Sequence, residues 1–164
     1  MAVAGEDRQK PAPCLTAQME TNIGRRAGED NLPSGGAAAG DGKPRIVGGD
    51  LNTIMAGLAC GEPNTISWDI LKNHVTTFVS ADDPITVRGM RMLAAPLKGD
   101  APIVSGESGA VPFGTLATIM LSDECKELRD QLDLNENSQV LAFSTEGDTD
   151  PDRYKNIVWR GFEK

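Results

Sequence analysis

Apolar residues recur at helical spacing along most of the chain that follows residue 46. Isoleucine, leucine, valine and methionine stand three or four positions apart in several stretches, which is the period of one face of an α-helix. The pattern predicts helices over residues 50–59, 65–80, 85–95, about 106–121, 123–132 and from 151 onward. Helix-start residues support these boundaries, because Asn64 and Ser122 are suitable N-caps and Asp150 followed by Pro151 is a favoured pair.

Two short apolar runs have a different character. Residues 102–105 and 139–143 are bounded by turn residues and are typical of short, buried strands. Strands that alternate with helices indicate an α/β fold. Two strands do not make a stable sheet alone, so we expect the chain to be incomplete or to rely on strands from a partner.

The first 45 residues differ from the rest. They contain four prolines and a glycine- and alanine-rich stretch at 35–42, and few apolar residues recur at a regular period. Such a composition buries little surface and predicts loop or disorder. The glycines at 35–40 have the spacing of a weak phosphate-loop pattern, but no predicted strand precedes them, which favours an ordinary loop. We therefore divide the chain into a loop-rich segment, 1–45, and a folded part, 46–164.

Charge and composition exclude several classes of function. The 164 residues carry a net charge of −8 with an isoelectric point near 4.6, which argues against nucleic-acid binding. The sequence contains no apolar run of about 18 residues that would span a membrane. The first residues lack the pattern of a signal peptide, so a cytoplasmic location is expected. Three separated cysteines (Cys14, Cys60 and Cys125) and one histidine (His74) do not predict a metal site.

Three motifs carry candidate chemistry. The first, residues 48–64, combines a glycine-rich turn with small residues, and on physical grounds tight helix packing explains it better than a ligand site. The second, Ser105–Val111, follows a predicted strand and opens a helix. Its amides are placed to face an anion or a polar edge of a cofactor, although a simple capped turn is an equal alternative.

The third motif is Ser144–Asp150. It places a hydroxyl at the end of a predicted strand, then a glycine and carboxylates, then a helix start, and ligands of open α/β sheets lie at such strand ends. The alternating carboxylates also suggest a calcium loop. That interpretation fails, because positions six and twelve counted from Asp148 are Arg153 and Trp159 instead of glycine and glutamate.

Together these motifs resemble diaminopropionate ammonia-lyases, which are pyridoxal-phosphate enzymes of the tryptophan-synthase β-like family, or fold type II. Residues 53–64 are nearly identical to a signature of that family, and the resemblance extends from about residue 38 to 161. It implies a partial three-layer sheet-and-helix domain that corresponds to the C-terminal part of the lyase, with the N-terminal catalytic portion missing. Pro112 and Phe113 depart from the family, in which glycine and a small apolar residue are usual.

The resemblance also implies roles for five residues in cofactor binding. Ser144 would hydrogen-bond the pyridine nitrogen of pyridoxal phosphate, with Thr145 as the close alternative. Gly147 and Asp148 would shape the turn, and Glu107 would lie near the ring or its phenolic oxygen. The resemblance assigns no catalytic residue to this chain.

The family's Schiff-base lysine lies in a Glu-Ser-x-Arg-Phe-Gly-type segment that has no counterpart here. The seven lysines stand in other contexts: Lys10, Lys43, Lys72, Lys98, Lys126, Lys155 and Lys164. The full enzyme would convert 2,3-diaminopropionate to pyruvate and ammonia, and this chain alone is expected to be inactive. Two alternatives stay open, a non-catalytic binding or assembly module and one subunit of a split enzyme. A homodimer, or association with a complementing chain, is expected.

Overall fold

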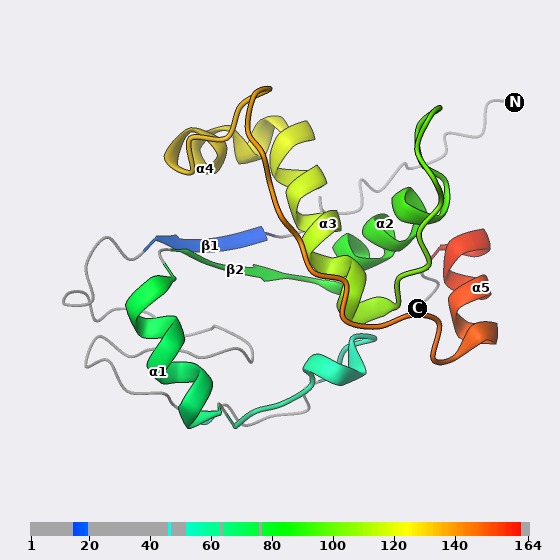
Figure 1. Ribbon diagram of the computed structural model, residues 1–164, viewed down its shortest axis with the longest axis horizontal. Helices are drawn as coiled ribbons and strands as arrows, with labels where there is room; N and C mark the ends of the chain where they lie inside the picture. Colours follow the sequence, from blue (N-terminus) through cyan, green and yellow to red (C-terminus); the bar gives the residue numbers. More distant parts are fainter. Residues whose placement is uncertain (1–14, 20–45, 47–51, 63, 76, 162–164) are drawn as a thin grey trace, which may run out of the picture.

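Helices dominate the structure, which is a computed structural model that describes residues 15–19, 46, 52–62, 64–75 and 77–161 (Figure 1). In chain order the elements are β1 (Leu15–Met19), the 3-10 helix η1 (Ala56–Leu58), α1 (Thr65–His74), β2 (Thr77–Ala81), α2 (Asp83–Ala94), α3 (Glu107–Leu121), the 3-10 helix η2 (Asp123–Cys125), α4 (Lys126–Gln131) and α5 (Pro151–Arg160). No helix among them has the length and apolar composition that crossing a bilayer requires.

The pairing of α2 with α3 is the most extensive helix contact in the described part of the chain. Two glycines permit it, because each lies where the two backbones touch. A Cβ at Gly89 would lie 2.3 Å from the carbonyl oxygen of Ala110, and one at Gly114 would lie 2.0 Å from that of Ile85. Both distances are shorter than any real contact, so the close packing depends on the absence of side chains at these positions.

The hydrophobic core lies where α2, α3 and α5 meet the segment that leads into η1. Its buried members are Ile54, Met55, Val87, Met90, Ala110 and Ile157. Thr53 ties this segment to the start of α2, since its hydroxyl donates to Asp83 Oδ1 at 2.6 Å. The same carboxylate oxygen accepts from the amide of Ile54 at 3.2 Å.

Several predicted helix boundaries are confirmed. Asn64 caps α1, because its Oδ1 accepts from the amide of Ser67 at 2.9 Å. Asp150 caps α5 in the same way, accepting from the amide of Arg153 at 3.1 Å, and Pro151 is the first residue of that helix. Ser122 precedes η2 as predicted, but its side chain makes no capping hydrogen bond.

Two predicted helices are wrong in extent. Only Ala56–Leu58 is helical within the described part of 50–59, and it forms a single 3-10 turn. The predicted helix 65–80 ends at His74, and Thr77–Ala81 pairs instead with β1 in an antiparallel register of Leu15 with Ala81. The run that follows His74 is rich in β-branched residues, which favour strands. The rest of segment 1–45 lies outside the described residues, so its predicted character stays a prediction.

The two predicted buried strands are also wrong for the described part of the chain. Residues 102–105 and 139–143 belong to no sheet there, and most of their apolar side chains are exposed. Strands become buried only when neighbouring strands and covering helices are present. The described part is therefore a helical cluster with one two-stranded sheet, and the three-layer arrangement stays a prediction.

Candidate functional site

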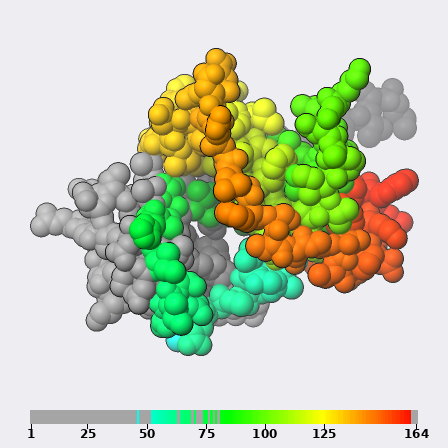
Figure 2. All heavy atoms as spheres, in the orientation of Figure 1, coloured from blue at the N-terminus to red at the C-terminus, as the bar shows by residue number. Residues whose placement is uncertain are grey.

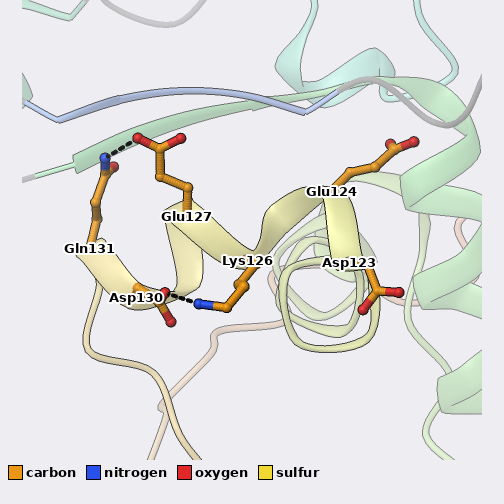
Figure 3. A pocket seen from close by; sticks show the side chains of 6 residues that line it. All are labelled: Asp123, Glu124, Lys126, Glu127, Asp130 and Gln131. Atoms are coloured by element: carbon orange, nitrogen blue, oxygen red, sulfur yellow. Dashed lines mark hydrogen bonds and ion pairs between the residues drawn. The ribbon is translucent and has the colours of Figure 1, made fainter.

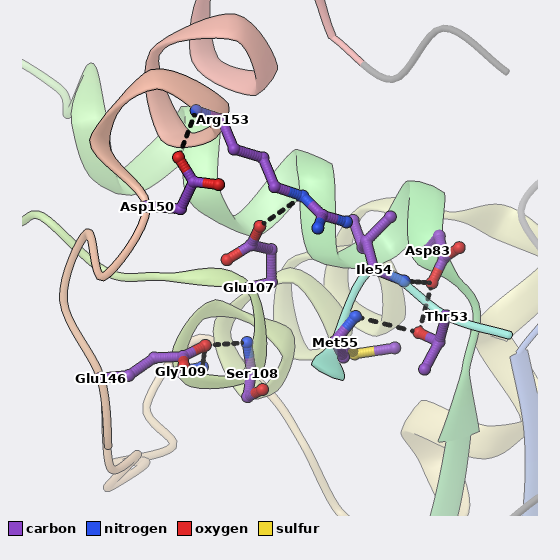
Figure 4. A network of polar contacts seen from close by, with 10 residues as sticks. All are labelled: Thr53, Ile54, Met55, Asp83, Glu107, Ser108, Gly109, Glu146, Asp150 and Arg153. Carbon is purple, nitrogen blue, oxygen red and sulfur yellow. Dashed lines mark hydrogen bonds and ion pairs between the residues drawn. The ribbon is translucent and has the colours of Figure 1, made fainter. Parts of the chain in front are cut away.

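The loop at residues 144–147 lies against the N-terminus of α3, and Glu146 holds it there. One carboxylate oxygen of Glu146 accepts hydrogen bonds from the backbone amides of Ser108 and Gly109, the latter at 3.3 Å (Figure 4). The backbone oxygen of Glu146 accepts from the amide of Gly106 at 3.1 Å. Three amides at the start of one helix are thus satisfied by a single residue of the loop.

The contact with Glu146 explains the role of the second motif, Ser105–Val111. Its amides were predicted to face an anion or a cofactor edge, and the anion is the carboxylate of Glu146, which the N-terminal end of the helix dipole also favours. Sequence reasoning considered Glu146 only as a calcium ligand. No local pattern could have revealed the contact, because 38 residues separate Glu146 from Ser108.

Ser144 lies at the exposed end of this loop, and a second serine orients it. Its Oγ is 2.8 Å from Oγ of Ser105, a side chain that is 1 % exposed. Ser144 Oγ also donates to the backbone oxygen of Glu146 at 3.3 Å. When Ser144 donates there, Ser105 must donate to Ser144, so the hydroxyl of Ser144 has a defined direction. Sequence reasoning missed the part played by Ser105.

Small residues at the start of α3 let the loop approach. A Cβ at Gly109 would lie 2.8 Å from Ser105 Oγ and 2.9 Å from Ser144 Oγ, and one at Gly106 would lie 2.4 Å from the backbone oxygen of Gly147. Gly147 itself was predicted to shape the turn. A Cβ there would meet nothing within 4 Å, and its φ lies outside the left-handed region, so the turn does not require this glycine.

Glu107 points toward α5 and not toward the serine pair. Its Oε1 is 3.1 Å from Nε of Arg153, in an ion pair whose glutamate side chain is 15 % exposed (Figure 4). Arg153 belongs to the first turn of α5, so the pair links the starts of two helices. The contacts of Glu107 are therefore separate from those of Ser144.

Thr145 and Asp148 complete the predicted set. Thr145 is exposed and makes no hydrogen bond within the described residues. Asp148 lies near Tyr154, whose pKa is raised above its ordinary value of 10.0, first by burial and second by the negative charge of Asp148. The structure thus brings Ser144 and Gly147 to the start of α3, where Glu107 also lies but pairs with Arg153. Thr145 and Asp148 lie in other surroundings.

The segment that contains the first motif also contacts α3, through η1. A Cβ at Gly57 in η1 would lie 3.0 Å from Oγ of Ser108. That hydroxyl is buried and has no hydrogen-bond partner among the described residues. The interpretation of the motif as tight packing therefore accounts for Gly57.

Charged side chains also line a shallow depression beside η2 and α4, which Figure 3 shows. Its lining residues are Asp123, Glu124, Lys126, Glu127, Asp130 and Gln131. Lys126 pairs with Asp130, and both are largely exposed. No group of side chains in the described residues has the arrangement of a metal site. The depression lacks the mixture of apolar walls and convergent polar groups that is typical of ligand sites.

The comparisons with known proteins find similarity to ammonia-lyases, one of which was solved with a pyridoxal-phosphate intermediate. The chain superposes with a TM-score of 0.64 on an Escherichia coli enzyme solved in complex with an aminoacrylate-PLP azomethine reaction intermediate, at 50 % identity over 66 % of this chain and 28 % of that one. The apo form of the same enzyme gives a TM-score of 0.58 at 44 % identity, over 60 % of this chain and 28 % of that one. No family model matches the sequence.

The curated relatives that match the sequence are diaminopropionate ammonia-lyases. The Salmonella typhimurium enzyme is 51 % identical over 126 residues, which cover 76 % of this chain and 31 % of the enzyme. The enzyme of Escherichia coli strain K12 is 50 % identical over 115 residues, which cover 70 % and 29 % respectively. The resemblance predicted from the motifs is confirmed, and the chain spans about 30 % of the length of the curated relatives that it matches.

Proposed function

We propose that this chain supplies one wall of the cofactor site of a pyridoxal-phosphate-dependent ammonia-lyase. The complete enzyme would eliminate ammonia from 2,3-diaminopropionate and yield pyruvate and ammonia. The observation that carries the proposal is the Ser144 hydroxyl, which Ser105 and Glu146 hold at an exposed loop in a chain half identical to such enzymes. The wall would belong to the three-layer fold of the family, in a cytoplasmic enzyme.

The polar groups of this wall suit the ring of the cofactor better than its phosphate. A serine hydroxyl can hydrogen-bond a pyridine nitrogen without carrying charge. A phosphate needs free cations or helix amides, and here the amides of Ser108 and Gly109 are filled by Glu146 while Arg153 is paired with Glu107. Residues outside this wall would therefore bind the phosphate.

When bound, pyridoxal phosphate would supply the electron sink that β-elimination requires. Ser144 would set the position of the ring edge. Its neutral hydroxyl can donate to the pyridine nitrogen or accept from it, so it would not require that nitrogen to be protonated. Ser105 would keep the Ser144 hydroxyl in place, and Thr145 is the alternative contact. Asp148 and Gly147 would form the edge of the site. Glu107 would hold α3 against α5 through its ion pair with Arg153.

The chain alone would be inactive, since none of its seven lysines stands in the sequence context of the family's Schiff-base lysine. Activity would require a homodimer of complete subunits or association with a complementing chain. A non-catalytic assembly module is the alternative. The occupation of the α3 N-terminus by Glu146 favours that alternative, because the helix amides have no place for an external anion.

A chimaera tests the proposal. The matching region of the Escherichia coli enzyme would be replaced by the corresponding residues of this chain, and cofactor absorbance and pyruvate release from 2,3-diaminopropionate would be measured. We expect both, and we expect Ser144→Ala to weaken cofactor binding by about 1 kcal/mol, or roughly fivefold. Thr145→Ala separates the two candidate contacts, because it should leave the affinity unchanged when Ser144 makes the hydrogen bond.

A folded chimaera that binds no cofactor would overturn the proposed function. If Ser144→Ala lowers thermal stability and leaves cofactor affinity unchanged, the serine is structural and the assignment is wrong. For the isolated chain, pyruvate release above a buffer-plus-cofactor control, abolished by borohydride, would contradict its inactivity.

A further inference from the structure

Ser105 and Ser144 form a hydroxyl pair whose two members lie in different surroundings. Ser105 is 1 % exposed, whereas Ser144 is exposed, and their Oγ atoms are 2.8 Å apart. The segment that contains residues 139–147, coloured orange in Figure 2, runs as a ridge across the visible face of the molecule. Solvent or a ligand can therefore reach Ser144 but not Ser105.

The burial of Ser105 decides which of the two hydroxyls donates. Among the described residues, Ser144 is the only hydrogen-bond partner of the Ser105 side chain. A buried donor that lacks an acceptor costs more free energy than an ordinary hydrogen bond contributes. The proton of Ser105 is therefore directed to Oγ of Ser144, which can itself exchange hydrogen bonds with solvent.

The proton of Ser144 is held less firmly. It is donated to the backbone oxygen of Glu146 over 3.3 Å, which is longer than a usual hydrogen bond between oxygens. That backbone oxygen also accepts from the amide of Gly106 at 3.1 Å, so it keeps a partner when Ser144 turns away. In a chain of hydrogen bonds, a hydroxyl that accepts from a neighbour becomes a stronger donor. Ser144 is thus prepared to donate its proton to a ligand.

We propose that Ser105 is a positioning residue that makes Ser144 a hydrogen-bond donor to an uncharged acceptor atom of the bound ligand. The inference rests on the proposed function, in which that acceptor is the ring nitrogen of pyridoxal phosphate. On binding, the proton of Ser144 would turn from Glu146 to the ligand, while Ser105 continues to donate to Ser144. The start of α3 packs tightly on this pair, because a Cβ at Gly109 would lie 2.8 Å from Ser105 Oγ and 2.9 Å from Ser144 Oγ.

A double-mutant cycle in the chain itself tests the direction of donation. Ser144→Val fills the space of the hydroxyl and accepts no hydrogen bond. It should lower the thermal unfolding temperature by at least about 2 °C when Ser105 is present, because the buried proton loses its acceptor. In the Ser105→Ala background the same substitution should have almost no effect. Equal losses in the two backgrounds would overturn the proposal.

Cofactor affinity in the Escherichia coli chimaera tests the consequence for the ligand. Ser105→Ala should weaken the binding of pyridoxal phosphate about threefold, less than Ser144→Ala does, because Ser144 keeps its own proton. An analogue with C–H in place of the ring nitrogen offers no acceptor, so Ser105→Ala should leave its affinity unchanged. Ser108→Ala is the matched control and should change neither affinity, because its hydroxyl is buried at the same helix start and has no hydrogen-bond partner among the described residues.

Two results with the chimaera would overturn the proposal. An equal loss of affinity for the cofactor and the analogue would show that Ser105 only supports the fold. An unchanged or raised cofactor affinity in Ser105→Ala would show that Ser144 does not act as the donor. The double-mutant cycle separates this proposal from the proposed function: coupling between the two serines in a chain whose chimaera binds no cofactor supports the donation from Ser105 and contradicts the function.

Discussion

The α2–α3–α5 cluster and the extended segment 139–143 contain the same kinds of apolar residue in opposite environments. Ile85 and Met90 in α2 are fully buried, whereas Leu141 and Phe143 stand in solvent. A helix satisfies its own backbone hydrogen bonds, so two or three helices can bury their apolar faces with what lies nearby. A strand needs neighbours for its backbone as well as for its side chains. The described helices therefore bury their apolar faces against one another, whereas residues 139–143 stay exposed.

Truncating one residue in each region gives the largest contrast. Met90→Ala should lower the free energy of unfolding by about 2–5 kcal/mol, because it opens a cavity in the core. Leu141→Ala should change it by less than about 0.5 kcal/mol. Urea unfolding followed by circular dichroism measures both. Similar losses in the two variants would show that Leu141 is buried in the isolated chain.

The glycine contacts sharpen the contrast within the cluster. Alanine usually stabilises a helix relative to glycine by about 1 kcal/mol, yet Gly114→Ala should destabilise this protein by about 1–3 kcal/mol, since the new methyl group would overlap the backbone of α2. Gly147→Ala, in open space, is the control and should be nearly neutral. A stabilising effect of Gly114→Ala in the same urea experiment would contradict the close packing of α2 on α3.

Glu146 connects the two regions, and its removal should have a moderate effect. Glu146→Ala leaves the amides of Ser108 and Gly109 without their carboxylate and should cost about 1 kcal/mol, the usual loss for a helix cap. Differential scanning calorimetry would measure the change. Glu136→Ala, on an exposed turn, is the matched control, and equal unfolding temperatures for the two variants would count against the capping role.

The smallest expected effect concerns pH. The pKa of Tyr154 is raised in the folded state, so the neutral form is favoured there, and this contribution to stability is present below pH 10 and lost as pH rises through the folded-state pKa. Tyr154→Phe should remove that alkaline dependence. Tyr154 is the only tyrosine in the sequence, so its absorbance reports the titration directly. Asp148→Asn should lower the pKa only in part, because burial is the larger cause.

Local signals predicted where several of the helices start. The starts of α1 and α5 were correct because Asn64 and Asp150 cap them through residues three positions away. The sequence also predicted a helix start after Ser105 and a hydroxyl of interest at Ser144, and the structure brings the hydroxyls of these two serines together. The cofactor contact of Ser144 stays a prediction. Both features follow from residues that are close in sequence to the elements they define.

Contacts between distant segments could not be predicted in the same way. The apolar run at 139–143 has the composition of a buried strand, but burial depends on neighbours that its own residues do not specify. The strand β2 was mistaken for the end of a helix, because a short apolar run fits either period and its pairing with β1 is remote. The carboxylate that fills the α3 N-terminus was missed for the same reason.

The capping of α3 also sets an order on its assembly during synthesis, when the N-terminal part of a chain emerges first. The C-terminal carbonyls of α3 at Ile119 and Met120 are bound by Nη1 of Arg129, at 2.8 and 3.1 Å, within ten residues of chain. The N-terminal amides must wait for Glu146, 38 residues beyond Ser108. Because Arg129 leaves the ribosome before Glu146, the C-terminal end of α3 can be capped before its N-terminal end. The serine pair is consequently among the last parts of the described fold to form, and a nascent chain arrested before residue 146 would hold a helix closed only at its far end.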